Sequence, residues 1–593
     1  MEQLYYGVDR KMKGLFIGFD ANGQKIYLDF KENPHFHIIG STRTGKSKLL
    51  EWMIRQNIKK GEGFCLIDPH GFLYDDIVKW CAYHYFDEDI ILLNPSEGDY
   101  INGFNPFRRS QAELSVQIDN QITVILRAWG ATDSNETPSL ERWLRCVLEA
   151  IVENDQTIIA AEYLIDFFEP EIREYLTSTL SKQLTRSDWK SASNAKTPKQ
   201  FYDDTQILST RNRLTRILTH PQVCRFMGMR ENNIDIGKIM DEGKILLVNL
   251  RPSDHLSRQN SHFFGALLVN EFFEQAFRRK RIDGESPIPF YLYIDEFQNF
   301  VKTPDIGDML DQVGKYGLRL ILSHQRLGQI ERENKDIIDA LFTNVRNRAI
   351  FGGLTDETAD FVVRNCFVNQ LDLKQIKKAI YQTKFWPTYD RDKVYAHTEG
   401  SSVGFSTMST SGKASSIHSA PPGEGWFDSF EAPPILSITD SESDIEGDGD
   451  FEGYSSSDSV IDIPIYRPVP FQELSSEEYW SLENQIWRMS ESLRGQFQRH
   501  CFVQIPAQKT QPMLVPFVKS FYVSDNEVTE YERCLYNRTN ALPKAEADMI
   551  IDMSRRDLRQ KALESDNDLT EPETFRVAKQ PVESKLLKRS KKV

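Results

Sequence analysis

The sequence feature that most constrains the fold is a glycine-containing loop of the form G-x-x-x-x-G-K-S, from Gly40 to Ser47. A short apolar run, residues 36–39, precedes this loop. After it, apolar residues recur near helical spacing at Leu49, Leu50, Met53, Ile54 and Ile58. A strand, such a loop and then a helix is the context in which this motif binds the phosphates of a nucleotide. We therefore expect an α/β nucleotide-binding domain.

Each part of this loop predicts a contact with ATP and Mg²⁺. Gly40 and Gly45 allow backbone N–H groups to turn toward phosphate oxygens, and the start of the helix adds positive potential. Lys46 is expected to reach the β- and γ-phosphates, and Ser47 to bind Mg²⁺. The predicted nucleotide-binding residues are Gly40, Ser41, Thr42, Arg43, Thr44, Gly45, Lys46, Ser47 and Lys48. A chance G-K-S loop is the alternative, and the flanking strand and helix argue against it.

A second apolar run, residues 289–294, ends in the adjacent carboxylates Asp295 and Glu296. Asp295 is expected to hold Mg²⁺, and Glu296 to orient and deprotonate the attacking water. A solvated turn would also place two acids after a strand, but the phosphate loop upstream favours the catalytic interpretation. A third apolar run, 318–323, leads to Gln325, whose amide is expected to contact the γ-phosphate or the water at the carboxyl edge of the sheet.

The bulk properties indicate a multidomain globular protein. The chain has 593 residues, of which 40% are hydrophobic and 27% charged, so a few domains are expected. It contains no apolar run of the roughly 18 residues that a membrane span requires. Residues 1–10 lack the apolar core of a signal peptide. The seven cysteines are scattered, with no C-x-x-C pair, which predicts reduced thiols and a cytoplasmic location.

The order of strand-like and helical patterns predicts the fold class α/β, with a mainly parallel sheet covered on both faces. From about residue 107 to 236 the pattern is helical throughout, which predicts an inserted all-helical domain. The predicted segments are a β-hairpin at 1–30, the first part of the ATPase core at 31–106, the helical insertion at 107–236, the second part of the core at 237–400, a disordered linker at 401–460, strands packing on the core at 461–530, and a helix with a basic tail at 531–593.

The predicted linker is rich in serine, glycine and acidic residues, and no basic residue falls between Asp440 and Asp458. Such a composition has too little apolar surface to order itself. An EF-hand calcium loop is the sharper alternative for its acidic part. However, Ile445 stands where that loop requires glycine, so we do not expect a calcium site.

These motifs together resemble the HerA/FtsK superfamily of ring-shaped DNA-pumping ATPases, and especially its TraG/TraD-like coupling proteins of conjugation and type IV secretion. The resemblance rests on residues 37–47, 67–71, 94–95, 103–106, 294–296, 316–326 and 344–348. It implies a RecA-like P-loop NTPase core, ATP and Mg²⁺ as ligands, non-specific DNA binding and a homo-oligomeric ring, expected to be a hexamer. It covers about 31–106 and 237–365, and more weakly the chain up to Val518.

The sequence departs from this family pattern at two places. Coupling proteins usually carry N-terminal membrane spans, which this sequence lacks, so any membrane association is expected to depend on a partner. In the superfamily an arginine often stands three residues before the glycine that opens the glutamine strand, but here that position is Gly314. The expected substitutes for a trans-acting arginine are Arg346 and Arg348, with Arg326 as a further candidate.

The resulting functional expectation is an ATP-driven DNA translocase of conjugative transfer. The net charge of −15 argues mildly against DNA binding, although a ring requires positive charge only along its channel. Two alternatives keep the ATP site. One is a secretion-system ATPase that acts on protein, and the other is a nucleotide-gated scaffold of a phage-defence complex. The implied partner protein is accordingly one of transfer, secretion or defence.

Overall fold

The computed structural model describes residues 14–570, with gaps at 87–88, 111, 130–137, 280–286, 301–309, 311, 334–335, 373, 405–411, 421–434 and 444–450. The chain forms two compact units. The first comprises Met1–Gln370 together with Ile486–Val593, and the second comprises Leu371–Gln485. The basic tail predicted at the end of the chain lies outside the described residues. No helix in the described parts combines the length and hydropathy of a membrane span.

The first unit is built on an eleven-stranded sheet in the order β2-β1-β16-β15-β10-β3-β9-β8-β4-β7-β5. Seven of these strands are parallel neighbours, namely β3 (Phe36–Ile39), β4 (Phe64–Asp68), β5 (Ile90–Leu93), β7 (Ile245–Asn249), β8 (Phe290–Ile294), β9 (Leu318–His324) and β10 (Asn347–Phe351). The residues of β3, β4 and β8 are all buried, as expected for parallel strands covered on both faces. One strand, β9, lies between the phosphate-loop strand β3 and the acidic strand β8, so the predicted RecA-like α/β fold class is confirmed.

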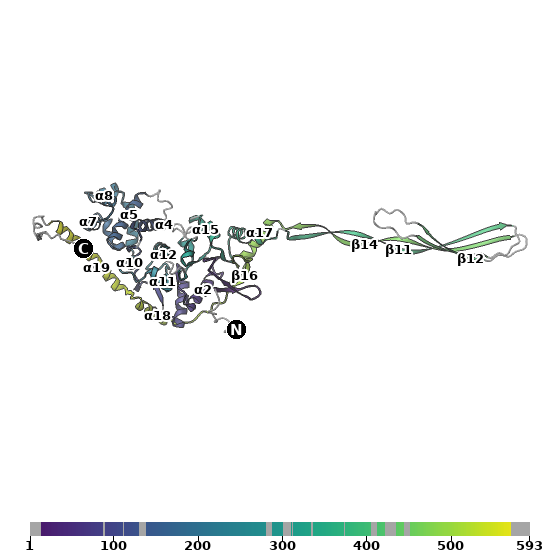
Figure 1. Ribbon diagram of the computed structural model, residues 1–593, viewed down its shortest axis with the longest axis horizontal. Helices are drawn as coiled ribbons and strands as arrows, with labels where there is room; N and C mark the ends of the chain where they lie inside the picture. The colour runs from purple at the N-terminus through teal and green to yellow at the C-terminus, as the bar shows by residue number, and fades with distance from the viewer. Residues whose placement is uncertain are drawn as a thin grey trace, which may run out of the picture. The chain divides into compact units, whose positions relative to one another are not determined.

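Helices cover this parallel sheet (Figure 1). They are α2 (Lys46–Lys60), α3 (Phe72–His84), α11 (Ile236–Glu242), α12 (Arg258–Arg278), α14 (Leu327–Glu333), α15 (Asp336–Asn344) and α16 (Asp356–Cys366). The helix α2 starts directly after the glycine loop and buries Leu49, Leu50, Met53, Ile54 and Ile58, the residues whose spacing predicted it.

The described residues between the short strand β6 (Tyr100–Ile101) and α11 contain helices and connecting loops but no strand. They form α4 (Leu114–Ala128), α5 (Pro138–Glu153), α6 (Ala161–Leu164), α7 (Pro170–Thr177), α8 (Gln183–Ser193), α9 (Leu208–Leu218) and α10 (Pro221–Met227). The apolar face of α5, with Trp143 and Leu144 among its residues, is fully buried.

The C-terminal residues of the first unit complete the sheet and brace the insertion. Antiparallel strands β15 (His500–Gln504) and β16 (Gln511–Leu514) lie between β10 and the hairpin of β1 (Leu15–Phe19) and β2 (Lys25–Leu28). After α18 (Asp525–Arg538) and β17 (Leu542–Pro543), the long helix α19 (Lys544–Thr570) contacts the insertion. Four ion pairs in the described residues join α19 to the insertion: Arg225 to Asp548 at 2.7 Å, Arg555 to Glu162 at 2.9 Å, Arg559 to Glu169 at 2.8 Å and Arg230 to Asp557 at 3.9 Å.

The second unit differs from the linker predicted at 401–460. It is an antiparallel sheet in the order β11-β14-β13-β12, with β11 (Ile376–Gly404), β12 (Gly412–Ala420), β13 (Ile435–Ser443) and β14 (Phe451–Tyr479), and α17 (Leu482–Arg494) follows it. The described part of 401–460 is therefore largely strand. The predicted limits of 237–400 and 461–530 are also corrected, because residues 376–400 pair with residues 455–479 in this sheet instead of belonging to the core.

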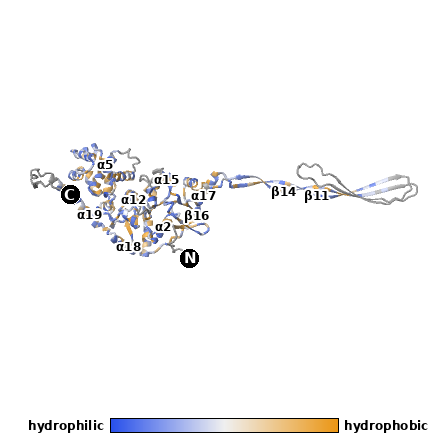
Figure 2. Cartoon of the chain, viewed as in Figure 1, coloured by the Kyte–Doolittle hydropathy of each residue, from blue (hydrophilic) through white to orange (hydrophobic). Residues whose placement is uncertain are grey.

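The physical reason for this difference is that backbone pairing does not require a hydrophobic composition. Figure 2 colours most of β11 and β14 blue or pale, with isolated apolar residues. Apolar residues nevertheless occupy every second position at Ile461, Ile463 and Ile465, and again at Val469 and Phe471. This period of two indicates a strand, but it begins beyond residue 460 and so gave no strand signal within the predicted linker.

Candidate active site

The phosphate loop lies between β3 and α2 and is supported from both sides. The N–H of Ser41 donates to the carbonyl of Gly352 at 3.1 Å, and the N–H of Arg499 donates to the carbonyl of Thr44 at 2.8 Å. A Cβ at Gly40 would lie 2.4 Å from the Cβ of Phe351, so only glycine fits there. Gly45 has φ of 121°, a conformation that other residues rarely adopt. Strand β10 and the segment before β15 therefore hold the loop in shape.

The side chain of Lys46 lies within this loop. Its Nζ donates to the carbonyls of Gly40 at 2.6 Å and Ser41 at 3.0 Å, and the residue is only 5% exposed. Burial lowers the pKa of Lys46, while the nearby carboxylates of Glu296 and Asp295 act in the opposite direction. A charged ammonium held among backbone carbonyls and facing two acids is positioned to bind an anionic phosphate group when one enters the loop.

The acidic residues at the end of β8 are buried beside Lys46. Asp295 and Glu296 are each 5% exposed. Burial raises the pKa of Asp295 to about 7, and the charges of Asp68 and Glu296 add to this effect. A divalent cation would offset this repulsion, because carboxylate and hydroxyl oxygens are the ligands that Mg²⁺ prefers. The donor set of Asp295 and the exposed Ser47 hydroxyl therefore fits Mg²⁺.

Glu296 is held in an unusual backbone conformation and by two amides. Its φ of 49° is left-handed, which is rare for a non-glycine residue and typical of functional positions. Its Oε1 accepts a hydrogen bond from Gln325 Nε2 at 2.6 Å, and its Oε2 accepts one from Gln298 Nε2. The structure thus brings Glu296 and Gln325, which lie on neighbouring strand ends, into direct contact, while leaving the carboxylate able to accept a proton.

Two of the predicted arginine candidates lie at the other end of β10. Arg348 is 4% exposed and bonded within its own chain, since it donates to Gln504 Oε1 at 2.7 Å and to the carbonyl of Phe342. Arg346 is exposed in the turn before β10. Because β10 runs parallel to β3, both residues lie at the edge opposite the phosphate loop of the same subunit. Arg326, also exposed, directly follows Gln325 at the carboxyl edge.

The remaining predicted loop residues are surface positions. Thr42 and Arg43 are exposed, and Arg43 has φ of 64°. The Thr44 hydroxyl donates to the carbonyl of Ser41 at 2.7 Å. The ammonium of Lys48 binds Glu51 at 2.7 Å and Asp76 at 2.8 Å, so only its backbone N–H is suited to contact a phosphate.

Sequence analysis did not include Asp68 among the site residues. It is fully buried at the end of β4, and its carboxylate accepts from the N–H groups of His70 at 2.8 Å and Tyr74 at 2.9 Å. Its charge contributes to the raised pKa of Asp295, which places Asp68 at the same end of the sheet. The signal was present in the sequence, because Asp68 ends an apolar strand just as Asp295 does.

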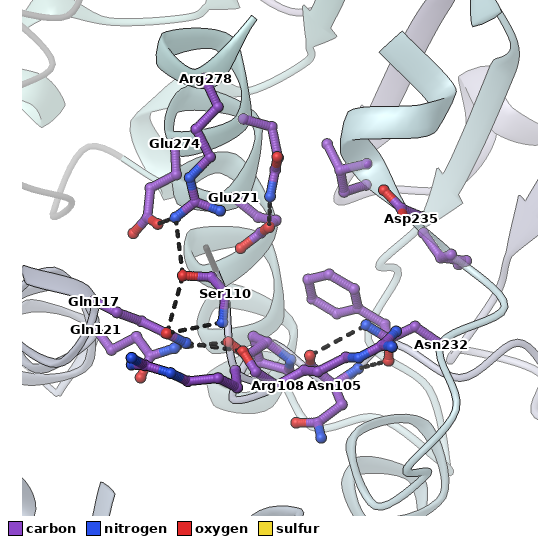
Figure 3. Close-up of a pocket in the computed structure, with 16 residues that line it drawn as sticks. Asn105, Arg108, Ser110, Gln117, Gln121, Asn232, Asp235, Glu271, Glu274 and Arg278 are labelled. Atoms are coloured by element: carbon purple, nitrogen blue, oxygen red, sulfur yellow. Dashed lines mark hydrogen bonds and ion pairs between the residues drawn. The ribbon is translucent and has the colours of Figure 1, made fainter. Parts of the chain in front are cut away.

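A cavity of about 400 Å³ lies away from these residues, between the insertion and the core. Figure 3 shows a chain of hydrogen bonds across it, from Glu274 through Arg278 and Ser110 to Gln117. Its lining residues come from α4, α11, α12 and the loops before α4 and α11, and include no member of the predicted ATP site. The cavity is therefore a feature of the junction between insertion and core.

The sheet order, the phosphate loop and the acidic strand end define a P-loop nucleoside triphosphatase of the RecA-like fold. Within this class, the family described as type IV secretory system conjugative DNA transfer matches residues 2–367, and the chain belongs to that family. No curated protein matches the sequence significantly.

Among solved structures, the unbound bacterial conjugative coupling protein TrwBΔN70 is 12% identical, with 86% of this chain and 91% of that chain covered and a TM-score of 0.46. TrwB in complex with ADP and Mg²⁺ is 13% identical, with 86% and 90% covered and a TM-score of 0.46. VirB4 of Thermoanaerobacter pseudethanolicus is 14% identical, with 60% and 87% covered and a TM-score of 0.39.

Proposed function

We propose that this protein is the ring-forming, ATP-driven DNA translocase of a conjugative transfer system. The observation that carries the proposal is the convergence of Lys46, Asp295, Glu296 and Gln325 at one edge of the sheet, in a chain of the conjugative DNA transfer family. The site supports ATP hydrolysis, and membership of the family supports DNA as the moved substrate.

The proposed mechanism assigns one task to each side chain. Lys46 binds the β- and γ-phosphates of ATP, and Ser47 and Asp295 hold Mg²⁺, which would neutralise charge developing on the phosphates. Glu296 accepts a proton from the attacking water. Gln325 donates to Glu296 and is placed to respond to the γ-phosphate, because its amide can bind either the carboxylate or a phosphate oxygen. Hydrolysis would thus change the contacts at the tip of β9.

The negative charge that develops on the phosphates in the transition state favours assembly of the subunits into a closed ring. A cationic side chain from a neighbouring subunit would complete each site, and head-to-tail contacts between identical subunits close into rings. Basic side chains on the inner wall would bind DNA phosphates without reading the bases. A ring of six subunits remains our proposal from the family resemblance.

The two predicted arginines are expected to behave differently when replaced. Arg348→Ala removes a buried guanidinium and leaves Gln504 and the Phe342 carbonyl without their partner, which should lower the free energy of unfolding by on the order of 2 to 4 kcal/mol. Arg346→Ala changes an exposed residue and should leave the melting temperature unchanged. If Arg346 acts across the subunit interface, its replacement should abolish turnover but preserve nucleotide binding.

Mixing subunits tests that trans role. Arg346→Ala and Lys46→Ala proteins are each expected to be inactive, but mixed rings contain some sites with an intact loop facing an intact Arg346. Partial recovery of ATPase activity is therefore expected. Absence of recovery in rings shown to be mixed would rule out Arg346 and direct attention to Arg326.

Stimulation by DNA is the experiment that tests the proposed function. The ATPase rate should rise when DNA is added to the assembled protein, and the stimulation should fall as salt increases, because bound phosphates release counterions. Assembly with a non-hydrolysable ATP analogue and Mg²⁺ is measured in parallel by light scattering. A monomer with DNA-independent hydrolysis would contradict the translocase and favour a nucleotide-gated scaffold. A ring stimulated only by a protein substrate would favour a secretion ATPase.

A further inference from the structure

Two histidines form a hydrogen bond inside the core sheet, on the two strands that lead to the phosphate loop and to Gln325. His37 lies on β3 and His324 ends β9, and both are fully buried. Their Nε2 atoms are 2.6 Å apart, with an angle of 13° between the ring planes and 4.8 Å between the ring centres. The distance between centres exceeds the nitrogen–nitrogen distance by about two ring radii, as expected for coplanar rings that meet edge to edge. The geometry is that of an in-plane N–H···N hydrogen bond.

This bond requires a defined arrangement of protons. One imidazole must carry its proton on Nε2 and donate, while the other must carry its proton on Nδ1 and accept through Nε2. Burial lowers the pKa of His324 to about 3, with the charge of Lys46 acting in the same direction. Burial also lowers the pKa of His37 well below its ordinary value, reinforced by His324 and Arg348. Burial therefore favours the neutral form of both rings, which is the form that this hydrogen bond requires.

The pair lies where the phosphate loop meets the glutamine strand. The backbone carbonyl of His324 accepts the N–H of Gly40, which opens the loop, at 3.4 Å. The next residue, Gln325, donates to Glu296. Main-chain pairing between β3 and β9 ends at Ile39 and His324, so the backbone beyond this point is no longer held by the ladder. A side-chain bond from His324, a member of this last pair, back to His37 can limit its movement, because a buried hydrogen bond favours one arrangement of its surroundings.

We propose that the His37–His324 hydrogen bond is a positioning element of the hydrolytic step, which holds Gln325 and Glu296 at a fixed distance from the phosphate loop. Neither histidine contacts the substrate. The inference rests on the proposed function insofar as Glu296 is taken to activate the attacking water. It goes beyond that proposal by assigning a role to two residues that are not among the predicted site residues.

Kinetics of matched variants test the positioning role. His37→Leu and His324→Leu should each lower kcat on the order of 10- to 100-fold, because small displacements of a catalytic group have effects of this size. KM for ATP should change less than about twofold, since the loop and Lys46 are retained. The double variant should be no worse than either single variant, because both remove the same bond. His37→Gln, whose amide can donate to His324, should recover most of the lost rate.

A third buried histidine provides the control. His35 bonds the carbonyl of Leu310 at 3.0 Å and the N–H of Leu320 at 3.1 Å, at the opposite end of β9 from Gln325. His35→Leu removes a buried imidazole of the same kind and should lower stability without a comparable loss of kcat. Equal losses of kcat in the His35 and His37 variants would show a general structural effect and would overturn the positioning role.

The hydrogen bond itself is detected in the wild-type protein by nitrogen-15 spectroscopy of labelled histidine. We expect a scalar coupling between the two Nε2 nuclei, one ring protonated at Nε2 and the other at Nδ1, and no titration of this pair around the ordinary histidine pKa near 6.5. Absence of the coupling, or unchanged kcat in folded leucine variants, would overturn the proposal. A wild-type protein that does not hydrolyse ATP would instead overturn the proposed function, while the spectrum would still decide whether the bond exists.

Discussion

Lys46→Ala is expected to lower ATP turnover on the order of 100-fold or more and to abolish tight nucleotide binding, with the fold intact. The ammonium is held by the carbonyls of Gly40 and Ser41, and no other lysine or arginine side chain in the described residues contacts these two carbonyls. A preorganised donor of this kind typically contributes this much to stabilising charge in a transition state. Binding of a fluorescent ATP analogue and steady-state phosphate release measure the two effects.

The matched control for this prediction is Lys31→Ala, which removes an exposed lysine outside the site. It should bind and hydrolyse ATP like the wild-type protein, and both variants should show wild-type circular dichroism. Near-normal turnover of the purified Lys46→Ala protein would mean that the loop does not bind the hydrolysed nucleotide.

Glu296→Gln is expected to bind ATP normally but to hydrolyse it on the order of 100- to 10,000-fold more slowly, the usual contribution of a general base. The amide keeps the size of the side chain and still offers an oxygen to Gln325 Nε2, so the local hydrogen bond is preserved. Asp295 remains available for Mg²⁺. In this variant the equilibrium affinity for ATP should therefore stay close to the wild-type value, while the rate of single-turnover hydrolysis falls.

Gln298→Ala is informative beside Glu296→Gln, because Gln298 also holds the Glu296 carboxylate. Its loss removes one orienting bond and should reduce the rate far less than loss of the carboxylate. If Glu296→Gln instead loses binding and hydrolysis together in a folded protein, Glu296 supports the structure of the site and is not the base.

The parts of the site that sequence could predict are those whose residues act through local context. The loop from Gly40 to Ser47 can be recognised from a strand before it and a helix after it, and the sequence pattern predicts both. Asp295, Glu296 and Gln325 follow apolar strands, and the carboxyl ends of parallel strands meet at one edge. The contact between Glu296 and Gln325 at 2.6 Å therefore needed little beyond the sheet order.

The parts that sequence could not predict depend on pairing between distant segments. Arg348 was a candidate for a trans role, and only the pairing of β10 with β15 shows that Gln504 occupies its guanidinium. The His37–His324 bond joins residues that are 287 positions apart. The composition of 401–460 suggested disorder, whereas its described residues are strands that pair with one another and with neighbouring segments. In each case the decisive information is which strand lies beside which.

The place of β15 and β16 in the sheet has a consequence for how the protein is made. These strands lie between β10 and β1, and the segment before β15 supports the phosphate loop through Arg499. Residues up to about 514 must therefore have left the ribosome before Arg499 can support the phosphate loop. The same residues are needed before β1 and β2 can join the sheet. Until then β10 is an unpaired edge, which invites aggregation. A chain truncated after α16 would retain Lys46, Asp295, Glu296 and Gln325. It would nevertheless lack the Arg499 contact that supports its phosphate loop.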